Sequence, residues 1–122
     1  MDILNYIGGD HMPANSGNWI DNLNPANNNL LGRIAKSNEE DVNHAITCAT
    51  KALSKWKCMG IEKRASYLLK LSTKIEENID DLALLETRDT GKPIHTSLNI
   101  DIPRSALNLK FFANFAVAQQ RE

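Results

Sequence analysis

The sequence has no long hydrophobic run, almost no net charge and only two cysteines among its 122 residues. No apolar stretch approaches the roughly 20 residues that a membrane-spanning helix needs, so we expect no membrane partner. The formal net charge of −1 gives no electrostatic basis for binding nucleic acid. The N-terminus lacks the basic start and long apolar core of an export signal. Together with the few cysteines, this favours reduced thiols and a cytoplasmic protein.

The composition is otherwise that of a small folded protein. Hydrophobic residues make up 42% of the chain and charged residues 24%, so the chain is not disordered by composition. A chain of this length forms one small domain with a modest core. Nothing in these totals indicates an activity.

Residues 1–36 show the pattern of short strands joined by turns. Gly8 and Gly9 can supply the positive φ angles of a tight hairpin turn. The run at residues 24–29, Asn-Pro-Ala-Asn-Asn-Asn, is a strong turn signal, since proline presets φ and asparagine tolerates left-handed conformations. The strands are expected at residues 4–7, 19–23 and 30–35. Such a short β-ribbon is marginal alone and should lie on another part of the protein.

Residues 37–122 show helical periodicity. Ser37 and Glu40 have the spacing of a capping box, which predicts a helix from there to about Lys57. A second helix follows from Ile61. Asn78 is in position to cap a third helix.

Glycine and proline mark the later helix boundaries. Gly91 should end the third helix as a left-handed C′ residue. Pro93 should then stand in the first turn of a short helix that runs to Ile100. Asp101 and Pro103 resemble the cap and first turn of a last helix.

The last helix is apolar nearly all round, which implies burial on several sides. We interpret its Phe111, Phe112 and Phe115 as core residues and not as a platform for stacking bases. The rest of the chain offers too little partner surface for them, which indicates that a larger protein surrounds this segment. The sequence thus predicts an α+β fragment, with an N-terminal β-ribbon (1–36) followed by a mainly helical segment (37–122).

No catalytic constellation is visible. His44 and Cys48 are four residues apart on one helix and could face one metal ion, but structural zinc needs four ligands. Cys48 and Cys58 are interpreted as a packing residue and a loop thiol, because neither has the His and acid pattern of a nucleophile. Gly8 and Gly9 do not form a phosphate-binding loop.

Asp89 is the least ordinary charged residue. It falls in the last turn of the third helix, where unpaired carbonyls carry partial negative charge and a carboxylate is unfavourable. In one interpretation, Arg88 or Lys92 offsets this charge in solvent. In the other, the carbonyls and the carboxylate form an oxygen-rich pocket for a hard cation. The residues alone favour the first interpretation.

Four stretches, read together, resemble the N-terminal segment of the NAD(P)-dependent aldehyde dehydrogenases. The resemblance covers residues 4–118, and its most specific part is Glu-Thr-Arg-Asp-Thr-Gly-Lys-Pro at residues 86–93. Residues 101–113 are further similar to the muconic-semialdehyde dehydrogenases, and residues 24–27 and the Asp89 stretch also resemble betaine-aldehyde dehydrogenases. The four stretches are residues 6–9, 24–26, 85–93 and 101–104.

The resemblance implies that the segment flanks and partly builds an α/β domain that binds NAD or NADP. Family enzymes oxidise an aldehyde to an acid through a cysteine thiolate, an oxyanion hole and a glutamate that helps water hydrolyse the thioester. These groups lie later in the family's chain, and the catalytic domain is absent here. The resemblance therefore implies that this chain alone holds no catalytic or cofactor-binding residue and is inactive. It also implies homo-oligomers in the full-length enzyme.

One functional site carries over from the resemblance. Several family members bind a monovalent cation, sodium or potassium. The matching positions here are Asn22, Leu23 and Asp89, and Leu23 would contribute its backbone carbonyl. A further ligand in the family comes from a later segment.

A second function class stays open. The chain is alternatively a stand-alone helical interaction module that binds a protein partner through its apolar last helix.

Overall fold

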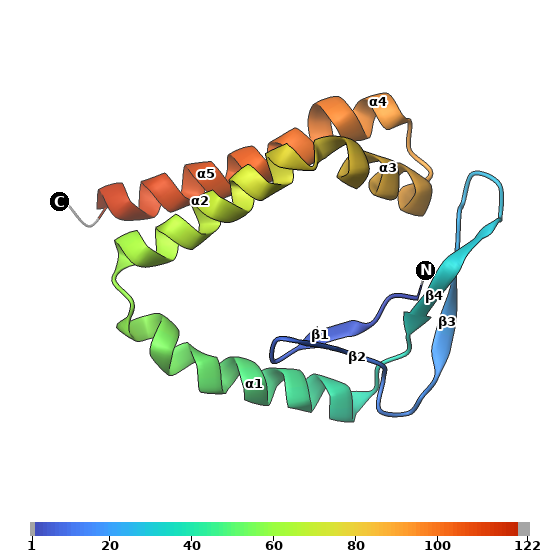
Figure 1. The fold of residues 1–122 in the computed structure, drawn as a ribbon, viewed down its shortest axis with the longest axis horizontal. Helices are drawn as coiled ribbons and strands as arrows, with labels where there is room; N and C mark the ends of the chain where they lie inside the picture. Colours follow the sequence, from blue (N-terminus) through green and yellow to red (C-terminus); the bar gives the residue numbers. More distant parts are fainter. Residues whose placement is uncertain (1, 120–122) are drawn as a thin grey trace. The chain divides into compact units, whose positions relative to one another are not determined.

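The computed structural model describes residues 2–119, which form short β-hairpins followed by helices (Figure 1). The chain divides into two compact units, residues 1–57 and 58–122, which are described separately. The expected division at residue 36 follows the change from strands to helices and stays a prediction. The elements are β1 (Asn5–Ile7), β2 (Asp10–Met12), β3 (Trp19–Leu23), β4 (Leu30–Ala35), α1 (Glu39–Cys58), α2 (Ile61–Glu77), α3 (Ile79–Thr90), α4 (Ile94–Thr96), the π-helix η1 (Ser97–Asp101) and α5 (Ile102–Gln119).

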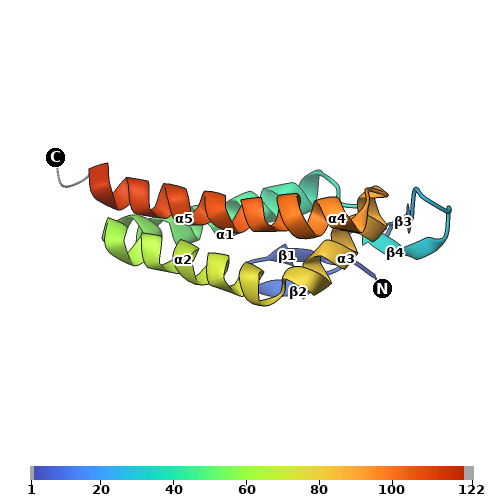
Figure 2. The same ribbon diagram turned by 90° about the horizontal axis from the view of Figure 1, so that it is seen from above.

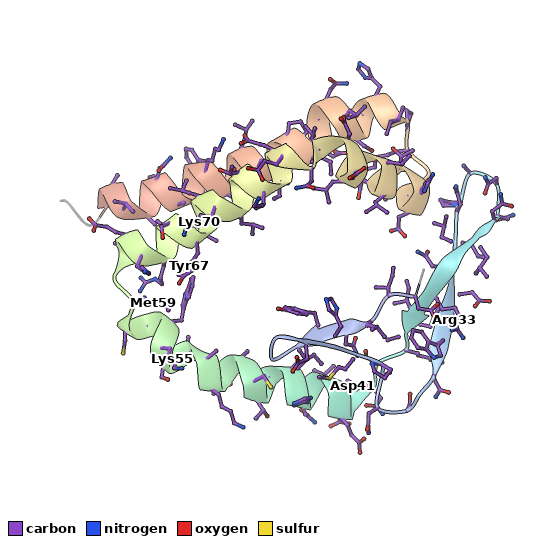
Figure 3. All side chains as sticks on the ribbon, in the orientation of Figure 1. Arg33, Asp41, Lys55, Met59, Tyr67 and Lys70 are labelled. Atoms are coloured by element: carbon purple, nitrogen blue, oxygen red, sulfur yellow. The ribbon has the colours of Figure 1, made fainter. Side chains whose placement is uncertain are left out.

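The expected ribbon of the first unit is two antiparallel hairpins, β1–β2 and β3–β4. Gly8 and Gly9 form the first turn with φ angles of 68° and 105°, as the Gly-Gly pair predicts. Ile3 continues the second hairpin by a parallel bridge to Ile34 on β4. Arg33 on β4 binds the Asp2 carboxylate at 2.6 Å, and its guanidinium lies 4.9 Å from the centre of the Trp19 ring (Figure 3).

Helix α1 begins one residue later than the capping-box spacing predicts. The Asn38 side chain accepts hydrogen bonds from the backbone N–H groups of Glu40 and Asp41, and the Asp41 carboxylate accepts from Asn38 N–H at 2.9 Å. The box is therefore formed by Asn38 and Asp41. Ser37, the expected cap, instead donates its hydroxyl to Asn5 Oδ1 at 2.9 Å, which ties the helix start to β1.

The second unit is built on α2 and α5, which run antiparallel and side by side (Figure 2). Small residues form their contact: Ala65 and Ser72 on α2, and Ala106 and Ala113 on α5, are all at most 5% exposed. The Ser72 hydroxyl donates to the Ala106 carbonyl oxygen at 2.9 Å across the two helices. Small side chains allow the two backbones to approach closely, so this contact is a tight seam in which no large side chain is fully buried.

The three phenylalanines of α5 are not core residues in this chain. Phe111, Phe112 and Phe115 are 61%, 62% and 51% exposed. These residues are apolar and their spacing predicts a helix. The spacing could not show that α2 would contact the alanine side of α5. The interpretation of the group as core is wrong for the chain itself.

The predictions for three helix starts also differ from the structure. The Asn78 side chain makes no cap hydrogen bond to α3; it donates to the Lys74 carbonyl and thus completes the end of α2. Pro93 lies just before α4 in extended conformation, and not within its first turn. Asp101 is not a cap either, because η1 passes directly into α5. Pro103 has no N–H to donate to the preceding turn, and the widened π turn lies immediately before it.

Candidate functional site

The best-defined polar structure of the second unit is the corner between α3 and η1, which contains Asp89. Gly91 ends α3 in the left-handed conformation, with φ 75° and its N–H donating to the Thr87 carbonyl at 2.9 Å. This confirms the prediction that Gly91 is the C′ residue. Thr90 adds a hydrogen bond from its hydroxyl to the Glu86 carbonyl at 2.7 Å. The last turn that carries Asp89 is therefore held by both backbone and side-chain bonds.

Lys92 joins the two sides of this corner. Its Nζ lies 2.8 Å from Glu86 Oε1 on α3 and 2.8 Å from Asp101 Oδ2 at the end of η1. Hydrogen bonds to Asp101, and next to Glu86, raise the pKa of Lys92 above its ordinary value. Glu86 is half-buried and belongs to this bridge. All three charged groups are partly shielded from water, so their geometry is better fixed than that of a fully exposed pair.

A second bond crosses the same corner beneath Lys92. The Thr87 and Ser97 hydroxyls lie 3.0 Å apart, and Ser97 is fully buried. Two independent polar contacts therefore fix η1 against the end of α3. Neither was visible in the sequence, although a lysine flanked by acids six residues before it and nine residues after it is a signal that a search for charged triads would find.

Asn22 and Leu23 lie together at the end of β3 in the first unit. The pairing with β4 shifts register between them, from Asn22↔Gly32 to Leu23↔Leu30, which leaves Leu31 as the extra residue of a β-bulge. The turn that follows is held by Asn24, whose side-chain oxygen accepts from Ala26 N–H at 2.9 Å. Bulges redirect backbone groups at the edge of a sheet, so the carbonyls at this point depart from the regular ladder.

The structure thus places the three expected cation ligands on two elements, β3 and α3. Asn22 and Leu23 stand on the bulge of β3, and Asp89 is exposed in the last turn of α3. These elements belong to different units, so the assembly of the three ligands into one site stays a prediction. Carboxylate, amide and carbonyl oxygens are the donors that a hard cation takes.

His44 and Cys48, which the sequence analysis considered as metal ligands, have neighbours in the first unit. Gly8 is packed over Cys48, since a Cβ on Gly8 would lie 3.4 Å from the Cys48 Sγ. A cavity of about 300 Å³ is lined by Asn15, Asp41 and His44 among others. Asp41 there already accepts hydrogen bonds from the N–H groups of Asn15 and Asn38, and its position is shown in Figure 3. Among residues 2–119, no group of three or more His, Cys, Asp or Glu side chains could hold a metal ion.

No helix in the described part of the chain has both the length and the apolar content that crossing a membrane requires.

The sequence model of the aldehyde dehydrogenase family matches residues 11–122. The chain belongs to this family. It is 35% identical to an acetaldehyde dehydrogenase of Pseudomonas aeruginosa and 37% identical to an aldehyde dehydrogenase of Vibrio cholerae. These matches cover 95% and 89% of this chain but only 23% and 22% of the relatives, so the chain spans less than a quarter of their length.

Solved structures contain the same fold. The crystal structure of PnpE in complex with nicotinamide adenine dinucleotide superposes with a TM-score of 0.91 at 37% identity, over 93% of this chain and 23% of that one. The NAD+ complex of the Bacillus cereus aldehyde dehydrogenase gives a TM-score of 0.90 at 32% identity, over 93% of this chain and 24% of that one. The expected α+β fragment, with short β-ribbons and helices from the N-terminal part of the family fold, is confirmed.

Proposed function

We propose that this chain is the N-terminal portion of an NAD(P)-dependent aldehyde dehydrogenase, a cytoplasmic homo-oligomer that oxidises an aldehyde or semialdehyde to a carboxylic acid. The observation that carries the proposal is the family match over residues 11–122, together with a fold shared with two enzymes solved with NAD. Those two neighbours favour NAD over NADP as the acceptor.

In this proposal the chain contributes scaffold and no reacting group. The thiolate nucleophile, the oxyanion-hole amide and the glutamate that activates water come from the longer part of the enzyme. Cys48 lies under the β1–β2 turn against Gly8, a packing role that fits no nucleophile. The chain alone therefore does not reduce NAD.

The activity is tested with a chimera. This chain replaces the aligned first part of the P. aeruginosa acetaldehyde dehydrogenase, and NADH formation from acetaldehyde is followed for the chimera, the isolated chain and the intact relative. The proposal predicts a chimera that turns over and an isolated chain that gives no NADH above buffer. NADH formation by the isolated chain would contradict the scaffold role. A folded chimera without activity would contradict the assignment to this enzyme class.

We assign the monovalent cation site of the full-length enzyme to Asn22, Leu23 and Asp89, with sodium or potassium as the ion. Two observations support it: the β-bulge between Asn22 and Leu23, and the braced turn that carries Asp89. The test is thermal unfolding of the chimera in sodium, potassium and tetramethylammonium chloride. A stabilisation by one of the small ions that is lost in Asp89→Ala supports the site. An equal effect of all three salts on the thermal midpoint would contradict the assignment of this cation site.

The sequence of residues 101–113 supports a muconic-type semialdehyde as the substrate, with a betaine-type aldehyde second. These substrates differ in charge, because a semialdehyde carries a carboxylate and a betaine aldehyde carries a quaternary ammonium. The ratio of their kcat/KM values in the full-length enzyme, not in the chimera, separates the two. A preference for the cationic aldehyde would reverse the order.

One observation favours a different function class. The exposed phenylalanines of α5 suit a stand-alone interaction module that binds a protein partner. If that alternative is right, the chimera should show no dehydrogenase activity, so the same NADH assay distinguishes it from the enzyme proposal.

A further inference from the structure

The Lys92 bridge has two carboxylates that converge on one positive charge. The Lys92 ammonium group lies 2.8 Å from Glu86 Oε1 and 2.8 Å from Asp101 Oδ2. The three side chains are only 32%, 34% and 34% exposed, whereas the nearby Lys74–Glu77 pair is 72% and 50% exposed. The ammonium group therefore occupies a partly enclosed position between two acids, which is the kind of position that a bound cation takes.

The elements that carry the two acids are fixed by contacts that do not involve the Lys92 side chain. On α3, the Gly91 N–H closes the last turn on the Thr87 carbonyl at 2.9 Å. On η1, Ser97 is fully buried, and its hydroxyl lies 3.0 Å from the Thr87 hydroxyl. The two acids should therefore stay near each other when the ammonium group is removed.

Asp89 adds a third carboxylate to this corner. It follows Glu86 by three residues on α3, and residues three apart are neighbours on the surface of a helix. The C-terminal end of the helix dipole adds further negative charge, while Arg88 of the same turn is exposed. The Lys92 ammonium is thus the positive charge that lies between carboxylates of this corner and lowers the negative charge that the corner presents to an ion.

We propose that Lys92 is a specificity-determining residue of the sodium or potassium site assigned to Asn22, Leu23 and Asp89. Its ammonium group takes the position between Glu86 and Asp101, so these two acids do not serve a bound ion and Asp89 is the carboxylate that does. The proposal rests on the proposed function, because it concerns the ion of that same site. It adds the reason why the ion is monovalent.

The number of charged ligands separates monovalent from divalent ions. The affinity of a site for Ca²⁺ is tuned by the charge of its ligands, and Ca²⁺ sites gather several carboxylates. Asp89 with the neutral oxygens of Asn22 and Leu23 supplies a single negative charge, which one monovalent ion balances. Lys92 adds to this preference, because the Coulomb energy is proportional to charge and a divalent ion is repelled twice as strongly at the same distance.

Removing the ammonium group should therefore open the corner to a divalent ion. In Lys92→Met, Glu86 and Asp101 lose the charge between them. Their two oxygens lie at most twice 2.8 Å apart in the wild type, since both contact the same nitrogen. Ca²⁺ binds oxygen ligands at about 2.3–2.6 Å, so a small inward movement lets one ion bridge the two carboxylates, with water completing its shell.

The first test uses the 122-residue chain, because the corner lies within its second unit. Thermal midpoints are compared in calcium chloride and in tetramethylammonium chloride at equal ionic strength. We expect about 10 mM Ca²⁺ to raise the midpoint of Lys92→Met by about 3 °C or more, and the midpoints of the wild type and of Lys92→Arg by less than about 1 °C. Lys92→Gln should also gain, so the test does not depend on the folding of the methionine variant.

Lys74→Met is the matched control for the first test. It removes the lysine of an exposed ion pair in the same unit and leaves one carboxylate in water. Its midpoint should show no gain from Ca²⁺ beyond that of the wild type.

The second test measures the ion preference of the full-length enzyme through the same thermal midpoints. In the wild type, sodium or potassium should stabilise more than Ca²⁺ at equal ionic strength. The order should reverse in Lys92→Met and persist in Lys92→Arg, which keeps the positive charge. A structural role of Lys92 alone would lower the midpoint in every salt without changing this order.

The proposal is overturned if neither Lys92→Met nor Lys92→Gln gains stability from Ca²⁺ in the chain, or if Lys92→Met keeps the wild-type order of ions in the full-length enzyme. A wild-type chain that Ca²⁺ stabilises as much as Lys92→Met also overturns it. If no small ion stabilises the wild-type enzyme more than tetramethylammonium does, the cation site itself fails and the role of Lys92 in it fails too. The expected ion order in an enzyme that forms no NADH contradicts the proposed activity and leaves this inference in place.

Discussion

The ammonium group of Lys92 lies 2.8 Å from Asp101 Oδ2, although Gly91 turns the chain just before the lysine and η1 ends at the aspartate. The same ammonium group lies 2.8 Å from Glu86 Oε1 in the preceding helix. One side chain thus connects α3 to η1 across the corner that carries Asp89.

Replacing Lys92 by methionine should loosen the corner. The variant keeps most of the aliphatic stem and removes the ammonium group, so it leaves two carboxylates without their shared partner. We expect the thermal midpoint of the isolated chain to fall by about 2–6 °C. Lys74→Met is the matched control, because Lys74 forms an ion pair with Glu77 that is far more exposed. Equal shifts of the thermal midpoint in the two variants would show that the Lys92 bridge stabilises the chain no more than the exposed Lys74–Glu77 pair does.

The bridge should also give the chain a defined dependence on alkaline pH. The folded-state pKa of Lys92 is raised above its ordinary 10.5 by Asp101 first and Glu86 second. A raised pKa means that the folded state holds the proton more tightly than the unfolded state. The contribution to stability is therefore complete below pH 10.5 and is lost as the pH rises through the raised value.

Urea unfolding of the wild type and of Lys92→Met between about pH 9 and 11 tests this dependence. The difference in unfolding free energy should be constant at the lower pH and shrink toward the upper end. A difference that stays the same across the range would mean that Lys92 does not stabilise the corner as an ammonium ion.

Gly91 should resist replacement for a conformational reason. Its φ of 75° costs an L-residue with a Cβ about 1 kcal/mol or more, whereas asparagine tolerates this region better. Gly91→Ala should therefore destabilise the chain by about 1 kcal/mol, and Gly91→Asn by less. Chemical denaturation measures both. An alanine variant as stable as the asparagine variant would contradict the left-handed C′ assignment.

The hydrogen bond across the α2–α5 seam can be measured separately from its packing. Ser72→Ala removes the bond to the Ala106 carbonyl and leaves little empty space, so it should cost about 1 kcal/mol. Ser72→Leu inserts a large side chain into a fully buried position and should cost more than Ser72→Ala, by about 1–3 kcal/mol. If Ser72→Leu were the milder change, the helices would not be in close contact at this point.

Local chemistry explains which features could be predicted from the sequence. The turn at Gly8 and Gly9, the strands around residues 24–29 and the helix end at Gly91 depend on backbone preferences of a few neighbouring residues, and all agree with the structure. The helix start near Ser37 was placed one residue too early. Asn38 and Asp41 form the capping box one residue further along, and Ser37 has a distant partner in Asn5.

Features that depend on distant partners could not be predicted in this way. Asn78 stands between two helices, and its own sequence does not say which of them its amide completes. The Lys92 bridge spans a turn and a π-helix, whose geometry the sequence pattern does not reveal. The sequence predicts that α5 is apolar nearly all round, but which of its residues are exposed depends on which side of the helix α2 contacts. The candidate ligands Asn22, Leu23 and Asp89 came from the family resemblance and not from periodicity.

If this chain is part of an aldehyde dehydrogenase fold, we expect its core to be complete only within that fold. Amide hydrogen exchange of α5 tests it most directly, because exchange reports the free energy of local opening. We expect the amides of residues 107–116 to exchange about 100-fold or more slowly in the chimera than in the isolated chain, which corresponds to about 2.7 kcal/mol of added protection. Equal exchange rates in the two proteins would contradict it.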